Sequence, residues 1–436
     1  MNFKEAEMDA RIPVEKAARV FRIARESGII SSVDTAVIFH DLGRMEGRIK
    51  RLQKLFPEST LHALAIKANP LVALLKRAVA AGAGMEAASI EEVHLALAAG
   101  CPPEKIVFDS PAKTDAELAF ALKKRIHINA DGLQELKRIE EMIAAGSDHG
   151  RVGLRVNPLV GAGSIAMTSV AGKNSHFGVS LDDKHQDVIM KAFASCRWLC
   201  GLHSHVGSQG CELSMLTAAA DRVWKFRQTV HQEIGREQIN VMDIGGGAPA
   251  LYSDTESRFS LEDYAEALKR EVPGLFEKDI RLVTEFGRSV LANCGFAVAR
   301  VESVKQISDR RIAVVHLGAD FLLRPVYQPE FWHHDCSLLD TRGYVTSGDP
   351  ASWSLAGPLC FSGDCFAGSV MLPPVHAGDH IVIRDTGAYT LSLWSRHCSR
   401  AIPLIIGYDE ADDRNIRFVT LRRRETVDDI VSFWSP

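Results

Sequence analysis

Short apolar runs alternate with segments rich in Ala, Leu, Glu and Lys from about residue 60 onward. Apolar runs of this length predict buried strands, and the composition of the intervening segments favours helices. The strand-like runs lie at 61–67, 84–89, 105–110, 126–131, 151–157, 198–207, 241–247 and 281–287. These eight strand–helix units predict an α/β fold, a (β/α)8 TIM-like barrel. An open nine-strand α/β sheet remains the alternative, because periodicity cannot show closure.

Helical spacing disappears after residue 296, and β-like segments take over. They lie at 298–307, 312–317, 380–385, 403–406 and 416–421. This part of the chain therefore predicts a second domain that is mainly β. Ahead of the barrel, the spacing of apolar positions predicts a helix over 14–28, a strand over 35–40 and a helix over 45–56.

Polar residues and glycines close each of the eight apolar runs. The carboxyl ends of barrel strands meet at one rim, which is where barrel enzymes have their active sites. A solvated strand end explains any one of these residues alone, but their coincidence favours a functional site. The residues are Lys67, Glu86, Ser110, Asn129, Asn157, His205, Gly245, Gly246, Gly247 and Glu285.

Lys67 differs from the others because the chain breaks soon afterwards at Asn69 and Pro70. A lysine at a strand end can be held neutral and act as a nucleophile, although most lysines are simply solvated. His203 and His205 alternate, so both imidazoles share one face of their strand. The Gly-Ser that follows leaves hydrogen-bond donors open, which suits a ring-stacking histidine beside an anion site. A core histidine with a satisfied hydrogen bond is the alternative.

The last two strand ends have features of a phosphate site. Three consecutive glycines, 245–247, remove side chains from a strand–helix turn and let backbone N–H groups approach a phosphate. Glu285 and Arg288 then flank Gly287. An arginine here can bind phosphate bidentately, and an Arg–Glu ion pair at the rim is the alternative. Phosphate sites in barrels favour the loops after strands seven and eight, which are these two.

Composition narrows the class of protein. The chain has 436 residues, of which 46% are hydrophobic and 24% charged, and its net charge is -4. This composition fits a two-domain globular enzyme and predicts neither a nucleic-acid partner nor a membrane partner. The N-terminus has no basic flank before an apolar core, and no apolar run approaches about 18 residues, so we expect a cytoplasmic protein.

The nine cysteines are scattered without a CxxC pair or a matching histidine pair. We therefore expect reduced thiols and no metal site. Cys360 lies on a turn-prone loop, 357–364, with the sequence GPLCFSGD. A thiol on such a loop is a candidate acid or nucleophile, and an inert thiol is the alternative.

Six ordered strings carry a family resemblance: AIKANP, HSHVGSQ, DIGGGAP, EFGR, GPLCFSGD and DTGAY, over residues 65–389. Together they resemble the fold-type III pyridoxal-phosphate decarboxylases, the ornithine and diaminopimelate decarboxylase family. The resemblance implies pyridoxal 5'-phosphate as the cofactor and a small-molecule amino-acid substrate. It implies a barrel at 44–296 and a β-rich domain formed by 1–43 and 297–436. It also implies a homodimer with shared active sites.

The resemblance assigns catalytic roles by position. Lys67 would bond covalently to the cofactor aldehyde, His205 would stack on its ring, and Glu285 would bind the ring nitrogen. Cys360 would reach the site of the neighbouring subunit and donate a proton to the carbon that lost its carboxylate. The other cofactor-binding residues would be Glu86, Ser208, Gly245, Gly246, Gly247, Gly287, Arg288 and Tyr389.

Glu285 also bears on the type of reaction. A carboxylate keeps the ring nitrogen protonated, so the cofactor can accept the electron pair left when carbon dioxide departs. This favours an amino-acid decarboxylase. Alanine racemases share the architecture but have an arginine at the ring nitrogen, so racemisation is the second interpretation. The third is a non-catalytic PLP-binding regulatory homologue, against which Lys67, Cys360 and the second domain argue.

Departures from the family pattern bear on the substrate. Phe286 replaces the usual proline of EFGR, which leaves both neighbouring charges in place. Phe361 stands where diaminopimelate decarboxylases have a glutamate that binds the distal amine and ornithine decarboxylases an aspartate. An aromatic ring cannot pair with ammonium as a carboxylate does, although a cation–π contact is conceivable.

Further departures add positive charge. Arg324 matches an Arg-Pro segment that holds a distal carboxylate in diaminopimelate decarboxylases, but Tyr327 comes one position early. Arg396 and His397 replace neutral groups near the pocket. Extra positive charge favours a substrate with an anionic or bulky distal end. The predicted substrate-binding residues are Arg324, Tyr327, Phe361, Asp364, Arg396 and His397.

Overall fold

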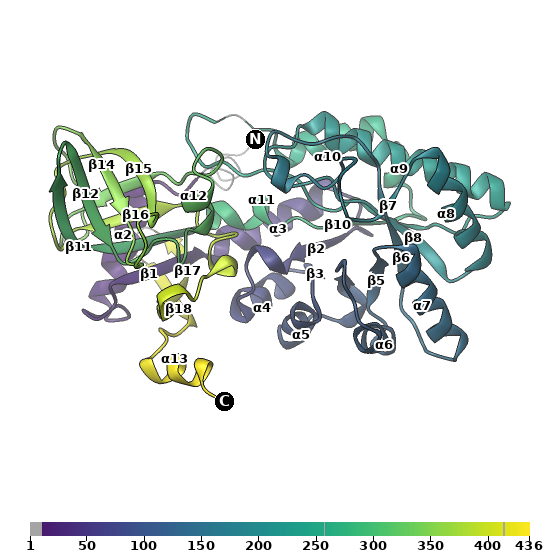
Figure 1. The fold of residues 1–436 in the computed structure, drawn as a ribbon, viewed down its shortest axis with the longest axis horizontal. Coiled ribbons are helices and arrows are strands. Elements are labelled where there is room, and N and C mark those ends of the chain that lie inside the picture. Colours follow the sequence, from purple (N-terminus) through teal and green to yellow (C-terminus); the bar gives the residue numbers. More distant parts are fainter. Residues whose placement is uncertain (1–10, 257, 413–414) are drawn as a thin grey trace. The chain divides into compact units, whose positions relative to one another are not determined.

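The computed structural model describes residues 11–256, 258–412 and 415–436, which form two compact units (Figure 1). One unit comprises Arg48–Ala250 and Arg258–Ser289. The other comprises the described residues of Met1–Gly47, Leu251–Ser257 and Val290–Pro436. The division expected from the sequence, with the barrel at 44–296, lies close to these limits and stays our prediction.

Parallel strands form a closed barrel in the first unit. Neighbouring strands pair in parallel, and the ring is complete because β10 pairs with β2 and β5 pairs with β6. The predicted barrel is therefore confirmed, and the open sheet is wrong. The barrel strands are β2 (Leu61–Ala65), β3 (Gly84–Ala87), β4 (Ile106–Phe108), β5 (His127–Ala130), β6 (Val152–Asn157), β8 (Leu199–His203), β9 (Val241–Asp243) and β10 (Arg281–Thr284).

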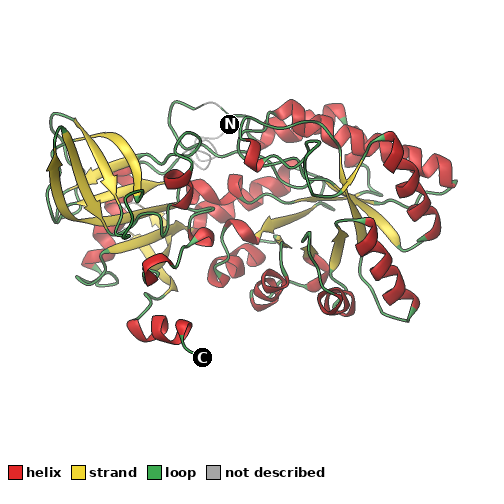
Figure 2. Cartoon of the chain, in the orientation of Figure 1, coloured by secondary structure: helices red, strands yellow, loops and turns green. Residues whose placement is uncertain are grey.

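A helix follows each barrel strand (Figure 2). Thr114 and Ser260 begin two of these helices as N-caps of capping boxes, which explains why the chain turns helical there. A short strand, β7 (Val179–Ser180), pairs with β6 before the chain enters α8. The helices are α4 (Val72–Ala80), α5 (Ile90–Ala98), α6 (Asp115–Lys123), α7 (Leu133–Ala144), α8 (Asp183–Ser195), α9 (Leu213–Ile234), α10 (Leu261–Glu271) and α11 (Arg288–Leu291).

The second unit is built mainly of strands, as predicted. Seven of them lie in the order β15-β14-β12-β11-β1-β17-β18, and β16 pairs with both β11 and β13. The strands are β1 (Ala36–Asp41), β11 (Gly295–Ile307), β12 (Arg310–Val315), β13 (Cys336–Leu339), β14 (Ala351–Ala356), β15 (Cys365–Leu372), β16 (His380–Arg384), β17 (Leu404–Asp412) and β18 (Asn415–Arg422).

The N-terminal segment takes part in this β unit. β1 lies between β11, to which it is antiparallel, and β17, to which it is parallel. The rings of Phe39 on β1 and Phe296 on β11 stack with centroids 4.8 Å apart. Helix α2 (Val14–Glu26) adds Ala17, Val20 and Phe21 to the same buried cluster. Helix α3 (Leu42–Leu55) then leads toward the first barrel strand.

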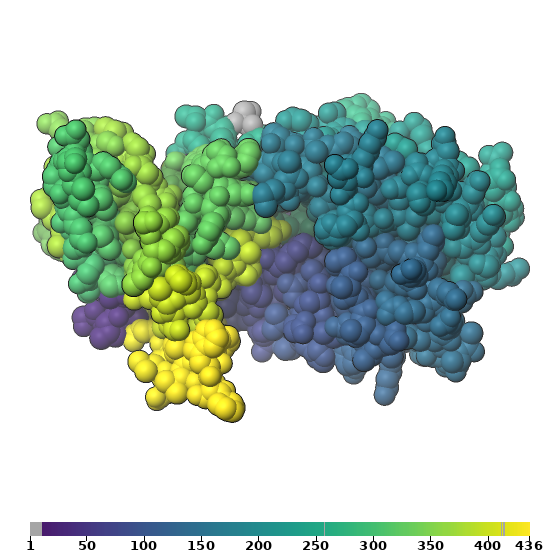
Figure 3. Space-filling view, viewed as in Figure 1, coloured from purple at the N-terminus to yellow at the C-terminus, as the bar shows by residue number. Residues whose placement is uncertain are grey.

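Two helices interrupt the β-rich region, which contradicts the expectation that helices end at residue 296. They are α12 (Leu323–Tyr327) and the C-terminal α13 (Val427–Trp434). A capping box at Thr426 and Asp429 begins α13, and this local signal outweighs the β-rich context. Figure 3 shows α13, in yellow, as a projection at the end of the chain. Among the described residues, no helix has the length and apolar composition needed to span a membrane.

Candidate functional site

Lys67 lies just beyond the carboxyl end of β2. The strand ends at Ala65, and one turn of 3-10 helix, Ile66–Ala68, carries the lysine. The sequence pattern predicted that the strand itself would extend to Lys67. Asn69 is extended, as a residue before proline must be, so the helical turn stops there. The Lys67 ammonium donates to Glu86 Oε2 over 2.6 Å. The lysine side chain is 38% exposed, whereas that of Glu86 is fully buried.

Glu86 lies on β3, and its pKa is well above that of an ordinary glutamate. Burial raises its pKa, and attraction to Lys67 only partly offsets this effect. Repulsion from Glu285 and Asp109 raises it further, and the resulting pKa is about 8. Glu86 therefore orients the Lys67 amine without adding a full negative charge to the barrel at neutral pH.

His205 is a neutral imidazole in this structure. The Gly246 N–H donates to His205 Nδ1 over 3.0 Å, so that nitrogen is an acceptor and the ring proton is on Nε2. Burial lowers the pKa of His205 to about 3, which agrees with this tautomer. Gly245 has a φ of +65°, and a Cβ there would lie 2.6 Å from the same Nδ1. Only glycine allows the turn to pack against the imidazole.

The glycine turn packs against the end of β10, and two side-chain hydrogen-bond donors belong to the neighbouring segments. A Cβ on Gly246 would lie 2.5 Å from the backbone oxygen of Glu285, so the two segments touch through their backbones. Arg288 Nε donates to the hydroxyl of Ser208 over 3.1 Å. A guanidinium, a hydroxyl and a bare glycine turn together are suited to a phosphate group.

His203 is fully buried between two carboxylates in the barrel interior. Its Nδ1 lies 3.4 Å from Asp109 Oδ1, and its Nε2 lies 3.6 Å from Glu285 Oε2. Asp109 also lies 3.3 Å from Arg155 Nη1. The three groups are close enough for a metal ion to bridge them, but a protonated imidazole has no lone pair to offer.

Electrostatics favour the imidazolium here. Burial works to lower the pKa of His203, but attraction to Asp109 and Glu285 outweighs it and raises the pKa well above its usual value. Burial alone would raise the pKa of Glu285, yet the charge of His203 lowers it to about 2. Burial and repulsion from Glu285 raise the pKa of Asp243 to about 8. Glu285 is therefore ionised at neutral pH although it is buried.

Asp109 and Arg155 were not identified from the sequence, and His203 was noted only as a neighbour of His205. The missed signal is a charged residue inside an otherwise apolar strand, as in Leu154-Arg155-Val156 or at the end of Ile106–Phe108. Such a residue is costly to bury unless it has a partner, so it points to an internal ion pair. The partner itself lies far along the chain and no local pattern identifies it.

Three predicted rim residues serve the loops or the barrel interior. The Ser110 backbone oxygen accepts a hydrogen bond from Lys113 Nζ over 2.7 Å. Asn129 Nδ2 donates to Asp243 Oδ2 over 3.0 Å. Asn157 binds the backbone of Gly172 and of Leu159. They stabilise the rim, and the structure brings Lys67, Glu86, His205 and Glu285 together without them.

The β unit carries the predicted Cys360 on its own loop, and the thiol is exposed. Asp364 ends this loop and is buried. Its carboxylate accepts hydrogen bonds from the Ala319 and Leu359 N–H groups at 2.7 and 2.6 Å, which compensate for its burial. We predicted that Asp364 binds substrate. Its contacts give it a structural role in the loop, and a role in substrate binding stays a prediction.

Three other predicted residues form an aromatic cluster in the same unit. The Phe361 ring stacks on Tyr327 with centroids 6.3 Å apart and an angle of 18°. It meets the His397 ring edge-on, with centroids 5.7 Å apart. Tyr327 is 65% exposed, so this cluster, Tyr327, Phe361 and His397, presents a ring surface to solvent.

The two predicted arginines differ in how they are bound. The Arg324 guanidinium lies 4.7 Å from the centre of the Tyr389 ring and 4.6 Å from that of Trp332. Arg396 makes a bidentate ion pair with Glu425, at 2.6 and 2.8 Å. Glu425 therefore offsets the charge of Arg396, whose contact with substrate stays a prediction. The local sequence around Arg396 could not reveal this partner, because β17 and β18 lie between the two residues in the chain.

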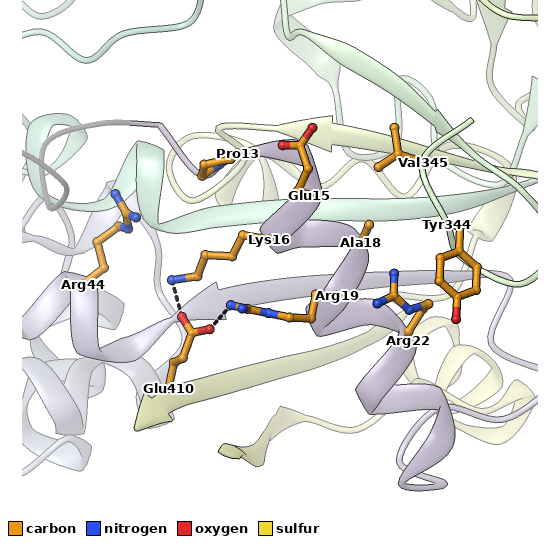
Figure 4. Close-up of a pocket in the computed structure, with 10 residues that line it drawn as sticks. All are labelled: Pro13, Glu15, Lys16, Ala18, Arg19, Arg22, Arg44, Tyr344, Val345 and Glu410. Atoms are coloured by element: carbon orange, nitrogen blue, oxygen red, sulfur yellow. Dashed lines mark hydrogen bonds and ion pairs between the residues drawn. The ribbon is translucent and has the colours of Figure 1, made fainter. Parts of the chain in front are cut away.

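The β unit also contains a cavity of about 650 Å³, which is a second candidate binding site (Figure 4). Lysine and arginine side chains line it, but Glu410 accepts contacts from both Lys16 and Arg19. The Arg22 guanidinium lies over the Tyr344 ring at 4.1 Å. These cations are already engaged within the unit, so we assign no ligand to this cavity.

Comparison with known proteins decides the family. The family described as pyridoxal-dependent decarboxylase, pyridoxal binding domain, matches residues 42–292, which is more than half of the chain. The chain belongs to this family. It is 31% identical to diaminopimelate decarboxylase of Campylobacter jejuni over 84% of this chain and 88% of the relative. It is 29% identical to that of Zymomonas mobilis over 85% of each.

Solved structures agree with this assignment. Helicobacter pylori diaminopimelate decarboxylase, solved with L-lysine, superposes with a TM-score of 0.82 at 26% identity. The match covers 94% of this chain and 98% of that one. The lysine/ornithine decarboxylase of Vibrio vulnificus, at 20% identity, has a TM-score of 0.72 and shares the fold. The predicted family, pyridoxal-phosphate cofactor and carboxy-lyase class are therefore confirmed, and this pyridoxal-dependent decarboxylase resembles diaminopimelate decarboxylases.

The rim residues fit the cofactor of this family. Glu285 Oε1 is buried and has no hydrogen-bond partner among the described residues, so an ionised acceptor is available for a ring nitrogen. Lys67 could supply an amine, and Ser208 and Arg288 could supply donors for the phosphate beside the bare glycine turn. These groups come from β2, β8, β9 and β10 or the segments that follow them.

The buried His203 cluster predicts a pH-dependent stability difference. His203→Gln removes the cation between two buried carboxylates, which should cost about 3–5 kcal/mol. The folded pKa of His203 is raised, so its contribution is complete below its unfolded value of 6.5 and is lost as pH rises. The folded pKa of Glu285 is lowered, so the contribution of Glu285 to the free energy of unfolding is present above pH 4.5 and is lost toward pH 2. Urea unfolding should show the largest difference between these two pKa values, 4.5 and 6.5.

The control is His185→Gln, at a half-exposed surface histidine that pairs with Asp182. It should cost less than about 1 kcal/mol. A small, pH-independent effect of His203→Gln would contradict the assigned imidazolium.

Proposed function

We propose that this pyridoxal-dependent decarboxylase acts on an amino acid whose distal end is a carboxylate or a bulky acyl group. The observation that carries the proposal is Phe361, which stacks on Tyr327 and contacts His397 where diaminopimelate decarboxylases have a glutamate. The other carboxylate of the loop, Asp364, is occupied by backbone N–H groups. A free distal ammonium group would find no counter-charge on this loop.

Arg324 is the cation that we propose for the distal end. Its guanidinium lies 4.6 Å from the centre of the Trp332 ring and 4.7 Å from that of the Tyr389 ring, and these cation–π contacts limit its freedom to move. A guanidinium binds carboxylates bidentately, whereas it repels ammonium. The aromatic cluster beside it would accommodate a bulky acyl group.

Each catalytic role that we propose has a physical basis in this chain. Bound pyridoxal phosphate supplies an electron sink for the pair left when the carboxylate departs. Lys67 would hold the cofactor covalently, and Glu86 orients its amine. Glu285, kept ionised by His203, would accept a hydrogen bond from the protonated ring nitrogen. The neutral His205 would stack on the ring.

Cys360 is our proposed proton donor. Its thiol is exposed on a loop of the β unit, so it can reach a site outside its own unit. We propose that this site belongs to the neighbouring subunit of a homodimer, with Cys360 completing it. Sedimentation equilibrium tests the assembly directly, and a monomer mass for the active enzyme would contradict it. A cytoplasmic location also stays a prediction, which cell fractionation can test.

Diaminopimelate is the second candidate substrate. The observation that favours it is the similarity to diaminopimelate decarboxylases, at 29% and 31% identity over most of the chain. The distal end of diaminopimelate carries a carboxylate, which could pair with Arg324. It also carries an ammonium group, for which Phe361 offers no counter-charge. The two candidates therefore differ in one charge at the distal end of the substrate.

Replacing Lys67 tests the proposed function itself. Lys67→Ala should abolish the visible absorbance band of the lysine-bound cofactor and lower amino-acid-dependent carbon dioxide release roughly thousandfold or more, because it removes the covalent attachment. Lys76→Ala, at an exposed lysine of α4, should leave both unchanged. Cofactor that borohydride reduction attaches to a different lysine would contradict the assignment. Racemisation without carbon dioxide release would contradict the decarboxylase.

A separate prediction concerns substrate choice. The native enzyme should prefer an amino acid ending in carboxylate, or an N-acylated diamino acid, over free lysine and ornithine by roughly ten- to a few hundredfold in kcat/KM. Phe361→Glu should shift this preference toward lysine, ornithine and diaminopimelate, because it restores a counter-charge for ammonium. Phe361→Leu removes the ring without adding charge and should not. Efficient turnover of free lysine or ornithine by the native enzyme would contradict the proposed pocket.

A further inference from the structure

Two of the nine cysteines differ from the rest in exposure. Cys360 and Cys398 are exposed, whereas the other seven are buried or half-buried. Cys360 is the proposed proton donor, and no role has been assigned to Cys398. The other cysteines are Cys101, Cys196, Cys200, Cys211, Cys294, Cys336 and Cys365.

The two exposed cysteines are in contact although they lie far apart in the sequence. The Cys360 N–H donates to the Cys398 sulfur over 3.4 Å. The neighbouring residues also touch, since the rings of Phe361 and His397 meet at 5.7 Å. Disulfides need Cα atoms within about 7 Å, and a sulfur that contacts the backbone of the other cysteine brings the two residues close to that range.

Both loops are held in place. Asp364 fixes the Cys360 loop through its two backbone hydrogen bonds. Ser395 N–H donates to the backbone oxygen of Asp320 over 2.8 Å, which ties down the other loop. Cys398 has a φ of +57°, a conformation that residues other than glycine rarely adopt. The surrounding contacts therefore impose the position of this thiol.

We propose that Cys360 and Cys398 form a reversible modification site, in which peroxide converts the two thiols to a disulfide. The cross-link itself follows from the contact between the two residues. Its effect on catalysis rests on the proposed role of Cys360, because a disulfide sulfur has no proton to donate.

The chemistry needs one co-reactant, a peroxide. The Cys360 thiolate attacks one oxygen of hydrogen peroxide, a sulfur–oxygen bond forms, and the oxygen–oxygen bond breaks with release of one water after protonation. The sulfur is oxidised by two electrons and the peroxide is reduced. The Cys398 sulfur then attacks the sulfenic sulfur, and the hydroxyl leaves as a second water. Two thiols and one hydrogen peroxide thus give one disulfide and two waters.

The remaining cysteines are poor competitors for this reaction. Burial raises the pKa of Cys101 and Cys336 to about 12 and that of Cys211 to about 11. These residues stay as thiols at neutral pH, and peroxide reacts with thiolates. Oxidation should therefore concentrate on the exposed pair.

The test treats the full-length holoenzyme with hydrogen peroxide, alkylates free thiols and identifies peptides by mass spectrometry. We expect a cross-linked pair containing Cys360 and Cys398 that is two hydrogen atoms lighter than the reduced peptides. Carbon dioxide release should fall in step with the cross-link and return after dithiothreitol. Cys398→Ser should keep its activity before treatment, yet oxidise past the sulfenic acid at Cys360 and lose activity irreversibly. Cys365→Ser is the matched control and should behave like the native protein.

The outcomes separate this proposal from the proposed function. If peroxide leaves both cysteines free to alkylate, or joins Cys360 to another cysteine, the modification site is wrong. If the cross-link forms and activity is undiminished, the modification site is confirmed and Cys360 is not the proton donor. A Cys398→Ser variant that recovers as fully as the native protein after dithiothreitol would also count against the pair.

Discussion

A protonated histidine between two buried carboxylates is the interaction on which the barrel site depends. Four acidic side chains, Glu86, Asp109, Asp243 and Glu285, are buried in the barrel. Burying several uncompensated negative charges costs far more than a domain's net stability. The fold avoids this by raising the pKa of Glu86 and Asp243 to about 8. The other two, Asp109 and Glu285, stay ionised. His203 lies beside both of them, and Arg155 lies beside Asp109. Glu285 is thereby held as an ionised acceptor in a place where an isolated glutamate would be neutral.

Much of the barrel could be predicted from the sequence, because its signal is local. Each strand is a short apolar run, and each is followed by a helix-forming segment, so all eight strands were found. The rim residues follow from the same pattern, since a strand's last residue is identified once the strand is. Lys67 was placed at the right rim even though a helical turn, and not the strand, carries it.

Long-range pairing could not be predicted in this way. Arg396 was expected to add charge to the pocket, but Glu425, 29 residues later, neutralises it. Asp364 was expected to face substrate, but its loop folds back so that backbone N–H groups surround it. In both cases the structure shows a partner for the residue that its local sequence pattern does not reveal. Helix α13 was missed for the opposite reason, because a capping signal of four residues was overlooked in a β-rich region.

The loops of the β unit carry the features that depart from the family. An aromatic cluster replaces a carboxylate beside Cys360, and a second cysteine lies against the same loop. The barrel therefore accounts for the chemistry that the chain shares with its relatives. The loops of the β unit are where a different substrate and a sensitivity to oxidation would arise.

In the holoenzyme, Glu285 should stay ionised and keep the cofactor ring nitrogen protonated. The most direct measurement is nitrogen-15 NMR of the holoenzyme loaded with pyridoxal phosphate labelled at the ring nitrogen. At neutral pH the native protein should give the resonance of a protonated pyridinium, and Glu285→Gln should shift it to that of a neutral pyridine. A neutral ring nitrogen in the native protein would contradict the account.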